Sequence, residues 1–289
     1  MVADFHGAQM ISGLEISYAS PMGLTIRNEL VPRIGSWFLL NQPILRHLTA
    51  VACKCHSVSE SDETFLLSFQ NSSAIGSGMA GLFITFEGSE ACGKSTQVKR
   101  LECKLHEMGK KAIVVHEPGS TDIGLAIRHI LLHMKENRAM CPETELLLFA
   151  ASRAQLVREV IDPALASGAV VVSDRFYDST TVYQGVARNL DPEFVAHLNQ
   201  FVVDGYRPDR TFVLDLDVEV ANRRRIRRVR PVGGGDRIEE LPQEFFMFVR
   251  QGYHDLAAKE PGRVKLIDAA PSADEVEAAI WKQLDGLLD

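Results

Sequence analysis

The chain has 289 residues, of which 46% are hydrophobic, and its 38 acidic and 31 basic residues give a net charge of −7. This apolar fraction is typical of a globular protein, and the length allows one or two domains. The acidic balance excludes a general basic surface for nucleic acids, and no apolar run reaches the roughly 18 residues of a membrane-spanning helix. We therefore expect neither nucleic acid nor a membrane as a partner. The five cysteines form no CxxC pair, which favours reduced thiols and a cytoplasmic location.

Residues 1–78 differ in character from the rest of the sequence. They carry only four basic and six acidic residues, show poor periodicity and end in a Ser/Gly-rich stretch over 72–78. Their first apolar cluster lies too far along for a secretory signal, and their few arginines match a transit peptide weakly. We expect a poorly structured N-terminal extension. An over-extended start ahead of Met79 is favoured over a true targeting or accessory segment.

From Met79 onward, short apolar segments alternate with helical patterns. The sequence predicts strands over 82–86, 111–115, 169–173, 211–216 and 264–267. It predicts helices around 95–108, 122–136, 143–167, 178–204, 218–229, 237–258 and 273–288. Buried strands that alternate with helices favour one α/β domain over 79–289, with a parallel sheet covered on both faces. The carboxyl ends of those strands then meet at one edge, where ligands bind.

The segment after the first predicted strand, 88–95, fits the phosphate-binding pattern GxxxxGK[ST]. Its glycines let backbone N–H groups face phosphate oxygens, and the helix that follows adds positive charge. Lys94 is expected to reach the β- and γ-phosphates of ATP, and the Ser95 hydroxyl to ligate Mg²⁺. The alternative is a glycine-rich turn with a solvated lysine. The candidate ATP-binding residues are Gly88, Ser89, Glu90, Ala91, Cys92, Gly93, Lys94, Ser95 and Thr96.

Two charged residues, Asp174 and Arg175, close the apolar strand that ends at Ser173. Both should therefore emerge at the ligand-binding edge. Asp174 is a candidate ligand of Mg²⁺, directly or through water, and Arg175 is a candidate to bridge donor and acceptor phosphates. A structural salt bridge is the alternative. A GTPase is disfavoured because the base-reading NKxD segment is not present, so the pattern points to phosphoryl transfer between small molecules.

A second basic cluster has five arginines within 223–228 and runs into the glycines at 233–235. Five arginines in six helical positions cannot all face one way, so some must be solvated. A basic helix that ends in a glycine-rich loop favours a mobile lid that delivers arginine to the transferring phosphoryl group. RNA binding through the same run is the competing interpretation.

Several segments together resemble thymidylate kinase of the bacterial type, a P-loop nucleoside monophosphate kinase family, over 81–288. The matching segments are Phe86-Glu87-Gly88, Glu117-Pro118-Gly119, Phe149 to Arg153, Asp174 to Gly185 and Asp236 to Glu239. The resemblance implies a P-loop NTPase fold of three layers with a five-stranded parallel sheet. It also implies phosphorylation of dTMP to dTDP with ATP and Mg²⁺, for dTTP synthesis, by an enzyme that is usually a homodimer.

The resemblance also implies roles for individual residues. Phe149 would lie against the thymine face, Arg153 would donate to a thymine carbonyl, and Thr180 and Gln184 would read the base edge. Tyr183 would pack by the deoxyribose. Core packing is the alternative for the two aromatic residues. The full set of candidate dTMP-binding residues is Glu90, Glu117, Arg128, Phe149, Arg153, Arg175, Thr180, Tyr183 and Gln184.

The catalytic residues implied by the resemblance are charged. Glu90 would accept a hydrogen bond from the sugar 3′-hydroxyl, and Arg128 with Arg175 would hold the dTMP phosphate. In the lid, the candidates are Arg224, Arg227 and Arg228, with Arg228 favoured for the transition-state contact. The candidate catalytic set is Lys94, Glu90, Arg175 and Arg228.

The sequence departs from the family pattern at a few positions. Ala91 and Cys92 stand where some members place an arginine, which points to a catalytic arginine from the lid. His116 replaces an arginine, Ser120 replaces a glycine, and the lid loop through 232–235 is longer. An oxidation-sensitive role for Cys92 is disfavoured against a small packing residue.

Three functions remain open at this point: a dTMP kinase, another nucleoside or nucleotide kinase on the same fold, and a non-catalytic P-loop module whose basic run contacts RNA. The first is favoured. A nucleoside acceptor would leave Arg128 and Arg175 without a phosphate partner, so comparing thymidine with dTMP separates the first two.

Overall fold

The computed structural model describes residues 15–18, 24–27, 81–134, 139–227 and 236–288. Contacts divide the chain into two units, Met1–Ile75 and Gly76–Asp289. The described part of the first unit is an antiparallel pair of short strands, β1 (Glu15–Tyr18) and β2 (Leu24–Arg27). Most of the expected extension lies outside the described residues, and the domain boundary near residue 79 stays a prediction.

The second unit is built on one sheet of five parallel strands. These are β3 (Phe83–Glu87), β4 (Ala112–His116), β5 (Val170–Asp174), β6 (Arg210–Asp215) and β7 (Val264–Asp268). Their order across the sheet is β4-β5-β3-β6-β7, with every neighbouring pair parallel. The five predicted strands are confirmed, each within one residue at either end. Because β5 separates β3 from β4, the winding direction reverses beside β3, and sheets of this type bind ligands at such a reversal.

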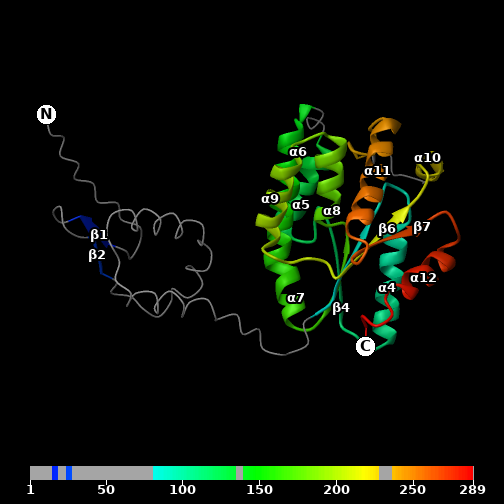
Figure 1. Ribbon diagram of the computed structural model, residues 1–289, viewed down its shortest axis with the longest axis horizontal. Helices are drawn as coiled ribbons and strands as arrows, with labels where there is room; N and C mark the ends of the chain where they lie inside the picture. The colour runs from blue at the N-terminus through cyan, green and yellow to red at the C-terminus, as the bar shows by residue number, and fades with distance from the viewer. Residues whose placement is uncertain (1–14, 19–23, 28–80, 135–138, 228–235, 289) are drawn as a thin grey trace. The chain divides into compact units, whose positions relative to one another are not determined.

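Helices cover both faces of this sheet (Figure 1). They are α4 (Lys94–Glu107), α5 (Asp122–Arg128), η1 (His129–His133), α6 (Pro142–Leu156), η3 (Val157–Ile161), α7 (Asp162–Ala166), α8 (Tyr177–Thr180), η4 (Thr181–Ala187), α9 (Pro192–Val203), α10 (Val218–Arg227), α11 (Gln243–Lys259) and α12 (Ala273–Lys282). Over the described residues, no helix has both the length and the apolar character needed to cross a membrane.

The side-chain alternation of the central strand produces the three layers. Ile84 and Phe86 of β3 point to one face, where they pack with Leu101 of α4 and Ile280 of α12. Phe83 points to the opposite face, where it joins a cluster formed by α6, η3, α7 and α9. All five residues of β3 are buried, because the strand has neighbours on both edges and helices on both faces. The predicted fold class is confirmed.

One predicted helix, 178–204, is broken into two in the structure. The run α8–η4 ends at Ala187, the chain turns through Asn189 at a positive φ of 55°, and α9 begins at Pro192. Proline suits the first turn of a helix because its missing N–H would be unpaired there. The Asp191 carboxylate accepts a hydrogen bond from the Phe194 N–H at 2.8 Å and so caps the new helix.

A second difference concerns the start of the helix predicted over 237–258. It begins only at Gln243, after Pro242, and the residues before it form turns. The stretch predicted as helical over 143–167 is confirmed as the continuous run α6–η3–α7. The helix predicted over 122–136 ends earlier, at His133, because Met134 has an extended backbone; residues 135 and 136 lie outside the described residues.

Candidate active site

A cavity of about 580 Å³ opens at the carboxyl ends of β3, β4 and β5. It brings together most of the residues that the sequence singled out: Glu90, Ala91, Gly93, Lys94, Ser95, Thr96, Glu117, Arg128, Phe149, Asp174, Arg175, Thr180, Tyr183 and Gln184. These come from five separate segments of the chain. The parallel sheet delivers them to one edge, as expected.

The phosphate-binding loop, 88–95, depends on glycines. Gly88 and Gly93 have positive φ values of 129° and 102°. A Cβ on Gly88 would lie 2.6 Å from the carbonyl oxygen of Leu214, so a larger residue does not fit there. α4 begins at Lys94, which places the positive end of its dipole at the loop. The Lys94 ammonium donates to two loop carbonyl oxygens, at 2.8 and 3.2 Å, and so stays inside the loop.

The two predicted Mg²⁺ ligands lie next to each other. The Ser95 hydroxyl at the start of α4 donates to the Asp174 carboxylate at the end of β5, across 2.9 Å. Over the described residues, no group of three or more His, Cys, Asp or Glu side chains gathers to hold a metal. Mg²⁺ at a phosphate site takes oxygen ligands and only one or two from the protein, with the rest from phosphates and water. The pair Ser95 and Asp174 fits that requirement.

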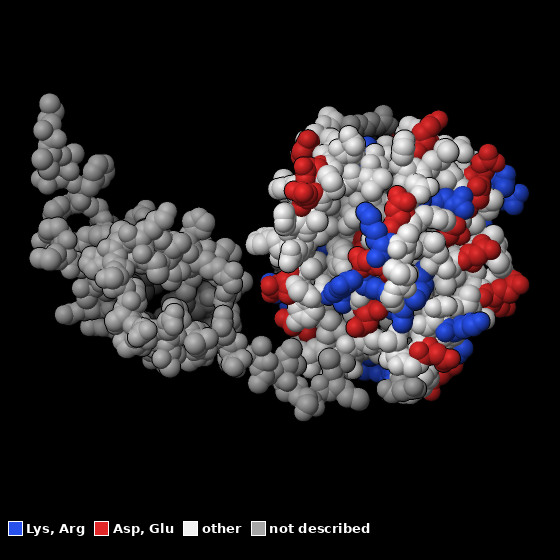
Figure 2. Space-filling view, viewed as in Figure 1, with Lys and Arg blue, Asp and Glu red and all other residues white. Residues whose placement is uncertain are grey.

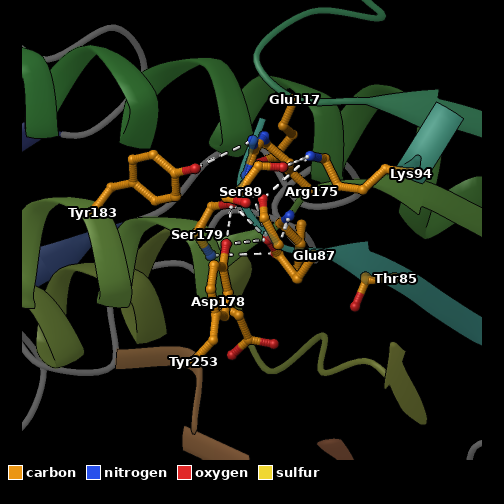
Figure 3. A network of polar contacts seen from close by, with 12 residues as sticks. Thr85, Glu87, Ser89, Lys94, Glu117, Arg175, Asp178, Ser179, Tyr183 and Tyr253 are labelled. Atoms are coloured by element: carbon orange, nitrogen blue, oxygen red, sulfur yellow. Dashed lines mark hydrogen bonds and ion pairs between the residues drawn. The ribbon is translucent and has the colours of Figure 1, made fainter. Parts of the chain in front are cut away.

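Arg175 lies in the middle of the cavity wall. Its φ of 73° turns the chain sharply after β5. The guanidinium pairs with Glu90 and donates to the hydroxyls of Ser179 at 3.1 Å and Tyr183 at 3.3 Å (Figure 3). Burial lowers the pKa of Arg175, but Tyr183 and Glu90 raise it well above its usual value, so the side chain stays cationic.

No role was predicted for Glu87 from the sequence, but its carboxylate holds the segment that follows Arg175 in place. Its fully buried carboxylate accepts hydrogen bonds from the Phe176 N–H at 2.8 Å, the Ser179 hydroxyl at 2.6 Å and the Tyr253 hydroxyl at 2.8 Å. Figure 3 shows the Glu87 side chain, at the end of β3, directed toward Ser179 and Tyr253. Burial raises the pKa of Glu87 above its usual value. A charged residue at the end of an apolar strand was the available signal.

Helices build another part of the cavity lining. Phe149 comes from α6, Thr180 ends α8, and Tyr183 and Gln184 lie on η4. Tyr183, Thr180 and Gln184 are almost fully buried, while Phe149 is half-buried. Arg128 at the end of α5 donates to the carbonyl oxygen of Pro118 at 2.8 Å. An aromatic surface, hydrogen-bonding groups and a cation therefore share this part of the lining.

Arg153 is placed differently from its neighbours. It is only 1% exposed and does not line the cavity. Its guanidinium donates to Glu117 at 2.8 Å, Thr180 at 2.9 Å and Asn199 at 3.2 Å. Burial raises the pKa of Glu117 to about 7, against the lowering effect of Arg153. The second Glu117 oxygen, Oε1, is buried and accepts no hydrogen bond within the described part of the chain. Direct contact of Arg153 with thymine stays a prediction.

The two lid arginines that the structure describes, Arg224 and Arg227, do not line the cavity. Arg224 of α10 donates to the carbonyl oxygens of Ala269 at 2.9 Å and Ala270 at 3.0 Å. Arg227 is exposed at the end of α10. Arg228 and the glycine-rich loop after it lie outside the described residues. Their catalytic roles stay predictions.

Comparison with known proteins decides the family. The thymidylate kinase family model matches residues 86–280. The thymidylate kinase of Geotalea daltonii is 45% identical over 212 residues, which cover 72% of this chain and 99% of that protein. The chain belongs to the thymidylate kinase family. The thymidylate kinase of Geobacter sulfurreducens is 48% identical over 211 residues, which cover 72% of this chain and 97% of that protein. The crystal structure of thymidylate kinase from Ehrlichia chaffeensis matches with a TM-score of 0.57 and 31% sequence identity. The match covers 71% of this chain and 99% of the chain in that structure.

Thymidylate kinases phosphorylate dTMP to dTDP using ATP, so this chain is a phosphotransferase. The family assignment, the fold and the reaction that the sequence predicted are confirmed. The roles of individual residues stay predictions, although most of those residues meet in one cavity.

Two departures from the thymidylate kinase pattern have a local explanation. The Ser120 hydroxyl accepts a hydrogen bond from the His116 N–H at 2.8 Å and lies 3.0 Å from the His116 Nδ1. The two substituted residues therefore support each other at the end of β4. Cys92 is 2% exposed and packs in the core beneath the phosphate loop, which favours its interpretation as a small packing residue.

The segment that follows the predicted lid, 236–239, contributes more to the site than the sequence predicted. Asp236, Ile238 and Glu239 line the cavity, although the sequence pattern predicted no role for them. Their neighbour Arg237 pairs with Glu145, a buried acid in α6 that was missed as well. A single acidic residue just before a run of leucines was the signal for Glu145.

Proposed function

We propose that this thymidylate kinase transfers the γ-phosphoryl group of Mg²⁺-bound ATP directly to the phosphate of dTMP within the cavity of about 580 Å³. The observation that carries the proposal is that the phosphate loop and Arg175 share this cavity with the aromatic and polar groups of α6 and η4. Donor and acceptor then meet in one place. Because both substrates are already bound and oriented there, much less translational and rotational entropy is lost on the way to the transition state.

On the donor side, the backbone of 88–95 holds the phosphates and Lys94 neutralises their charge. Ser95 and Asp174 hold Mg²⁺, Asp174 directly or through a water molecule. When bound between these residues, Mg²⁺ would supply positive charge that stabilises the negative charge developing during transfer.

On the acceptor side, Arg128 and Arg175 hold the dTMP phosphate. Their charges offset the repulsion between two anionic substrates. Glu90 accepts a hydrogen bond from the 3′-hydroxyl of the sugar while it keeps Arg175 in place. Phe149 lies against the thymine ring, Gln184 and Thr180 read its edge, and Arg153 supports Thr180 through its 2.9 Å hydrogen bond. Arg228, in the predicted lid, contacts the transferring phosphoryl group and stabilises the transition state.

We also propose that the enzyme is a homodimer. The helices α5, α6 and α9 pack side by side. Each exposes large apolar side chains: Leu125 is 49% exposed, Leu147 52% and Phe201 80%. Exposed apolar groups of this size on neighbouring helices favour an association surface, and a second copy offers a matching one.

We also propose that the enzyme is located in the cytoplasm. The three described cysteines, Cys92, Cys103 and Cys141, are free thiols, as in a reducing compartment. ATP, the phosphoryl donor, is also a cytoplasmic substrate.

The test is an acceptor-specificity assay on the full chain with ATP, run with and without Mg²⁺. We expect dTMP to be phosphorylated with a higher kcat/KM than dUMP, AMP, UMP or thymidine, and only when Mg²⁺ is present. Phosphorylation of thymidine in preference to dTMP would identify a nucleoside kinase instead. Equal rates for all the monophosphates would refute the assigned base site.

A further inference from the structure

Glu145 of α6 is a buried acid that the proposed reaction does not use. It is 1% exposed, and each of its partners in the described part of the chain is a hydrogen-bond donor. Gln184 Nε2 donates to its Oε1 at 2.8 Å, Arg188 donates to both oxygens at 3.0 and 3.2 Å, and Arg237 pairs with Oε2. Burial raises the pKa of Glu145, but the hydrogen bonds from Arg188, Gln184 and Arg237 lower it below the usual value. Glu145 is therefore ionised at neutral pH.

An ionised carboxylate only accepts hydrogen bonds. Of the two ends of the Gln184 amide, only the NH₂ group is able to donate, so the NH₂ group must face Glu145. The carbonyl end, Oε1, is then left for the cavity that Gln184 lines. Within the described residues no donor is hydrogen-bonded to Oε1 of Gln184, so this acceptor is available to a ligand.

We propose that Glu145 is a positioning residue that sets base specificity, because it fixes the Gln184 amide with an acceptor rather than a donor toward the base. Thymine carries an N–H donor at N3, which matches an acceptor. Cytosine carries a lone pair at N3, which would face the Gln184 oxygen without a proton between them. The proposal rests on the proposed function, in which Gln184 reads the base edge.

The same carboxylate ties the base site to the segment after the lid. Arg237 reaches Glu145 from between Asp236 and Ile238, and both of these line the cavity. Glu145 therefore holds three elements together: α6, η4 and the post-lid turn. A purely structural role in this triad is the alternative, and it predicts a loss of stability without any change in base preference.

The first test compares kcat/KM for dTMP and dCMP in the wild-type enzyme and in Glu145→Gln. The glutamine is able to donate as well as accept, so the Gln184 amide is free to turn its NH₂ group toward the base. A hydrogen bond of this kind is worth about 1.4 kcal/mol, so we expect the dTMP/dCMP ratio to fall at least tenfold. A ratio that stays at its wild-type value would overturn the proposal.

Arg188→Gln is the matched control. It removes a charged partner of Glu145 but leaves the hydrogen bond between Glu145 and Gln184. We expect it to lower the unfolding temperature and to keep the dTMP/dCMP ratio. If Arg188→Gln shifts the ratio as much as Glu145→Gln does, general loosening explains the effect and the proposal is wrong.

A double-mutant cycle shows whether Glu145 acts through Gln184. In a Gln184→Ala background, Glu145→Gln should leave the dTMP/dCMP ratio unchanged, because the amide that it orients is gone. An undiminished effect in that background would place the action of Glu145 elsewhere. A wild-type enzyme that already fails to prefer dTMP over dCMP would contradict the proposed function itself, which keeps the two failures distinct.

A measurement on the wild-type protein covers the case in which Glu145→Gln does not fold. The side-chain NH₂ of Gln184, assigned in an NMR spectrum by its loss in Gln184→Ala, should exchange slowly with solvent before dTMP is added. A fast-exchanging NH₂ that becomes protected only when dTMP binds would show the donor facing the base, and would overturn the proposal.

Discussion

Arg175 takes part in the site through shape as well as charge. Two nitrogens of its planar guanidinium, Nη1 and Nη2, contact a carboxylate, Glu90, and two hydroxyls, Ser179 and Tyr183. A lysine ammonium is a point donor and does not span these partners. The left-handed backbone at Arg175 fixes the direction from which the side chain enters, so its position depends on the wall around it.

We therefore expect Arg175→Lys to keep the positive charge but to lose the planar set of N–H donors that contacts several partners at once. With about 1.5–3 kcal/mol per lost charged hydrogen bond, kcat/KM for dTMP should fall about 10²-fold or more. Steady-state kinetics measure this. Arg223→Lys is the control, because Arg223 is exposed on α10 and does not line the cavity. Wild-type kinetics in Arg175→Lys would show that charge alone suffices.

The pKa of Glu117 predicts how stability depends on pH. It is raised from 4.5 to about 7, so the folded state holds the Glu117 proton more tightly than the unfolded state. The stabilisation from this group is complete below pH 4.5 and is lost as the pH rises through about 7. The excess unfolding free energy of the wild type over Glu117→Gln should therefore shrink between pH 5 and pH 8.

Urea unfolding at pH 5, 6.5 and 8 gives that difference directly. Glu159→Gln, an exposed substitution on the same helical run as Arg153, is the control for the loss of one carboxylate. A difference between wild type and Glu117→Gln that is constant with pH would mean that Glu117 titrates normally.

Sequence reasoning located site residues well where local spacing fixes them. Gly88, Lys94 and Ser95 belong to one short loop, and Asp174 joins them because parallel strands end at one edge. It failed for Glu87, whose partner Tyr253 is 166 residues away in the sequence. Contacts of that kind are set by tertiary packing, which leaves no local pattern to read.

At the scale of elements, strands were easier to predict than helix ends. The strands are short apolar runs between polar turns, and their limits are marked on both sides. Helical periodicity continued through the break before α9, because the four residues between Ala187 and Pro192 hardly disturb a pattern that repeats every 3.6 residues. The pair Asp191 and Pro192 was the local signal of a new helix start.

The cap of α9 can be tested at that element. Asp191→Ala removes the acceptor for the Phe194 N–H and should lower the unfolding free energy by about 1 kcal/mol. Asp191→Ser restores an acceptor and should recover most of the loss. Chemical denaturation measures both variants. An alanine variant as stable as the wild type would show that α9 is held by packing alone.

At the scale of the whole molecule, the apolar surface of α5, α6 and α9 predicts the oligomeric state. Sedimentation of the full chain should give a dimer. Phe201→Ser removes the most exposed of these side chains and should raise the dimer dissociation constant. Phe248→Ser, a change of the same type at a 59% exposed position on α11, is the control and should leave the dimer intact. A monomeric wild type at micromolar concentration would exclude the proposed interface.

The segment 1–78 raises a separate question. The family match begins at residue 86, and every residue that lines the cavity follows it. We expect a chain of 79–289 to have the same kcat and KM for dTMP as the full chain. Parallel kinetics of the two proteins measure this. A large loss of activity in the shorter chain would assign the segment a part in the enzyme.

The place of β3 in the middle of the sheet has a consequence for how the protein is made. Thr85 of β3 and Thr211 of β6 are 126 residues apart in the sequence, although their hydroxyls are 2.8 Å apart. At about 5–20 residues per second, a ribosome needs about 6–25 seconds to translate that interval. During this time β3, all five residues of which are buried in the folded protein, has left the ribosome with at least one edge unpaired. The nascent chain is therefore most prone to mispairing and chaperone binding before β6 emerges.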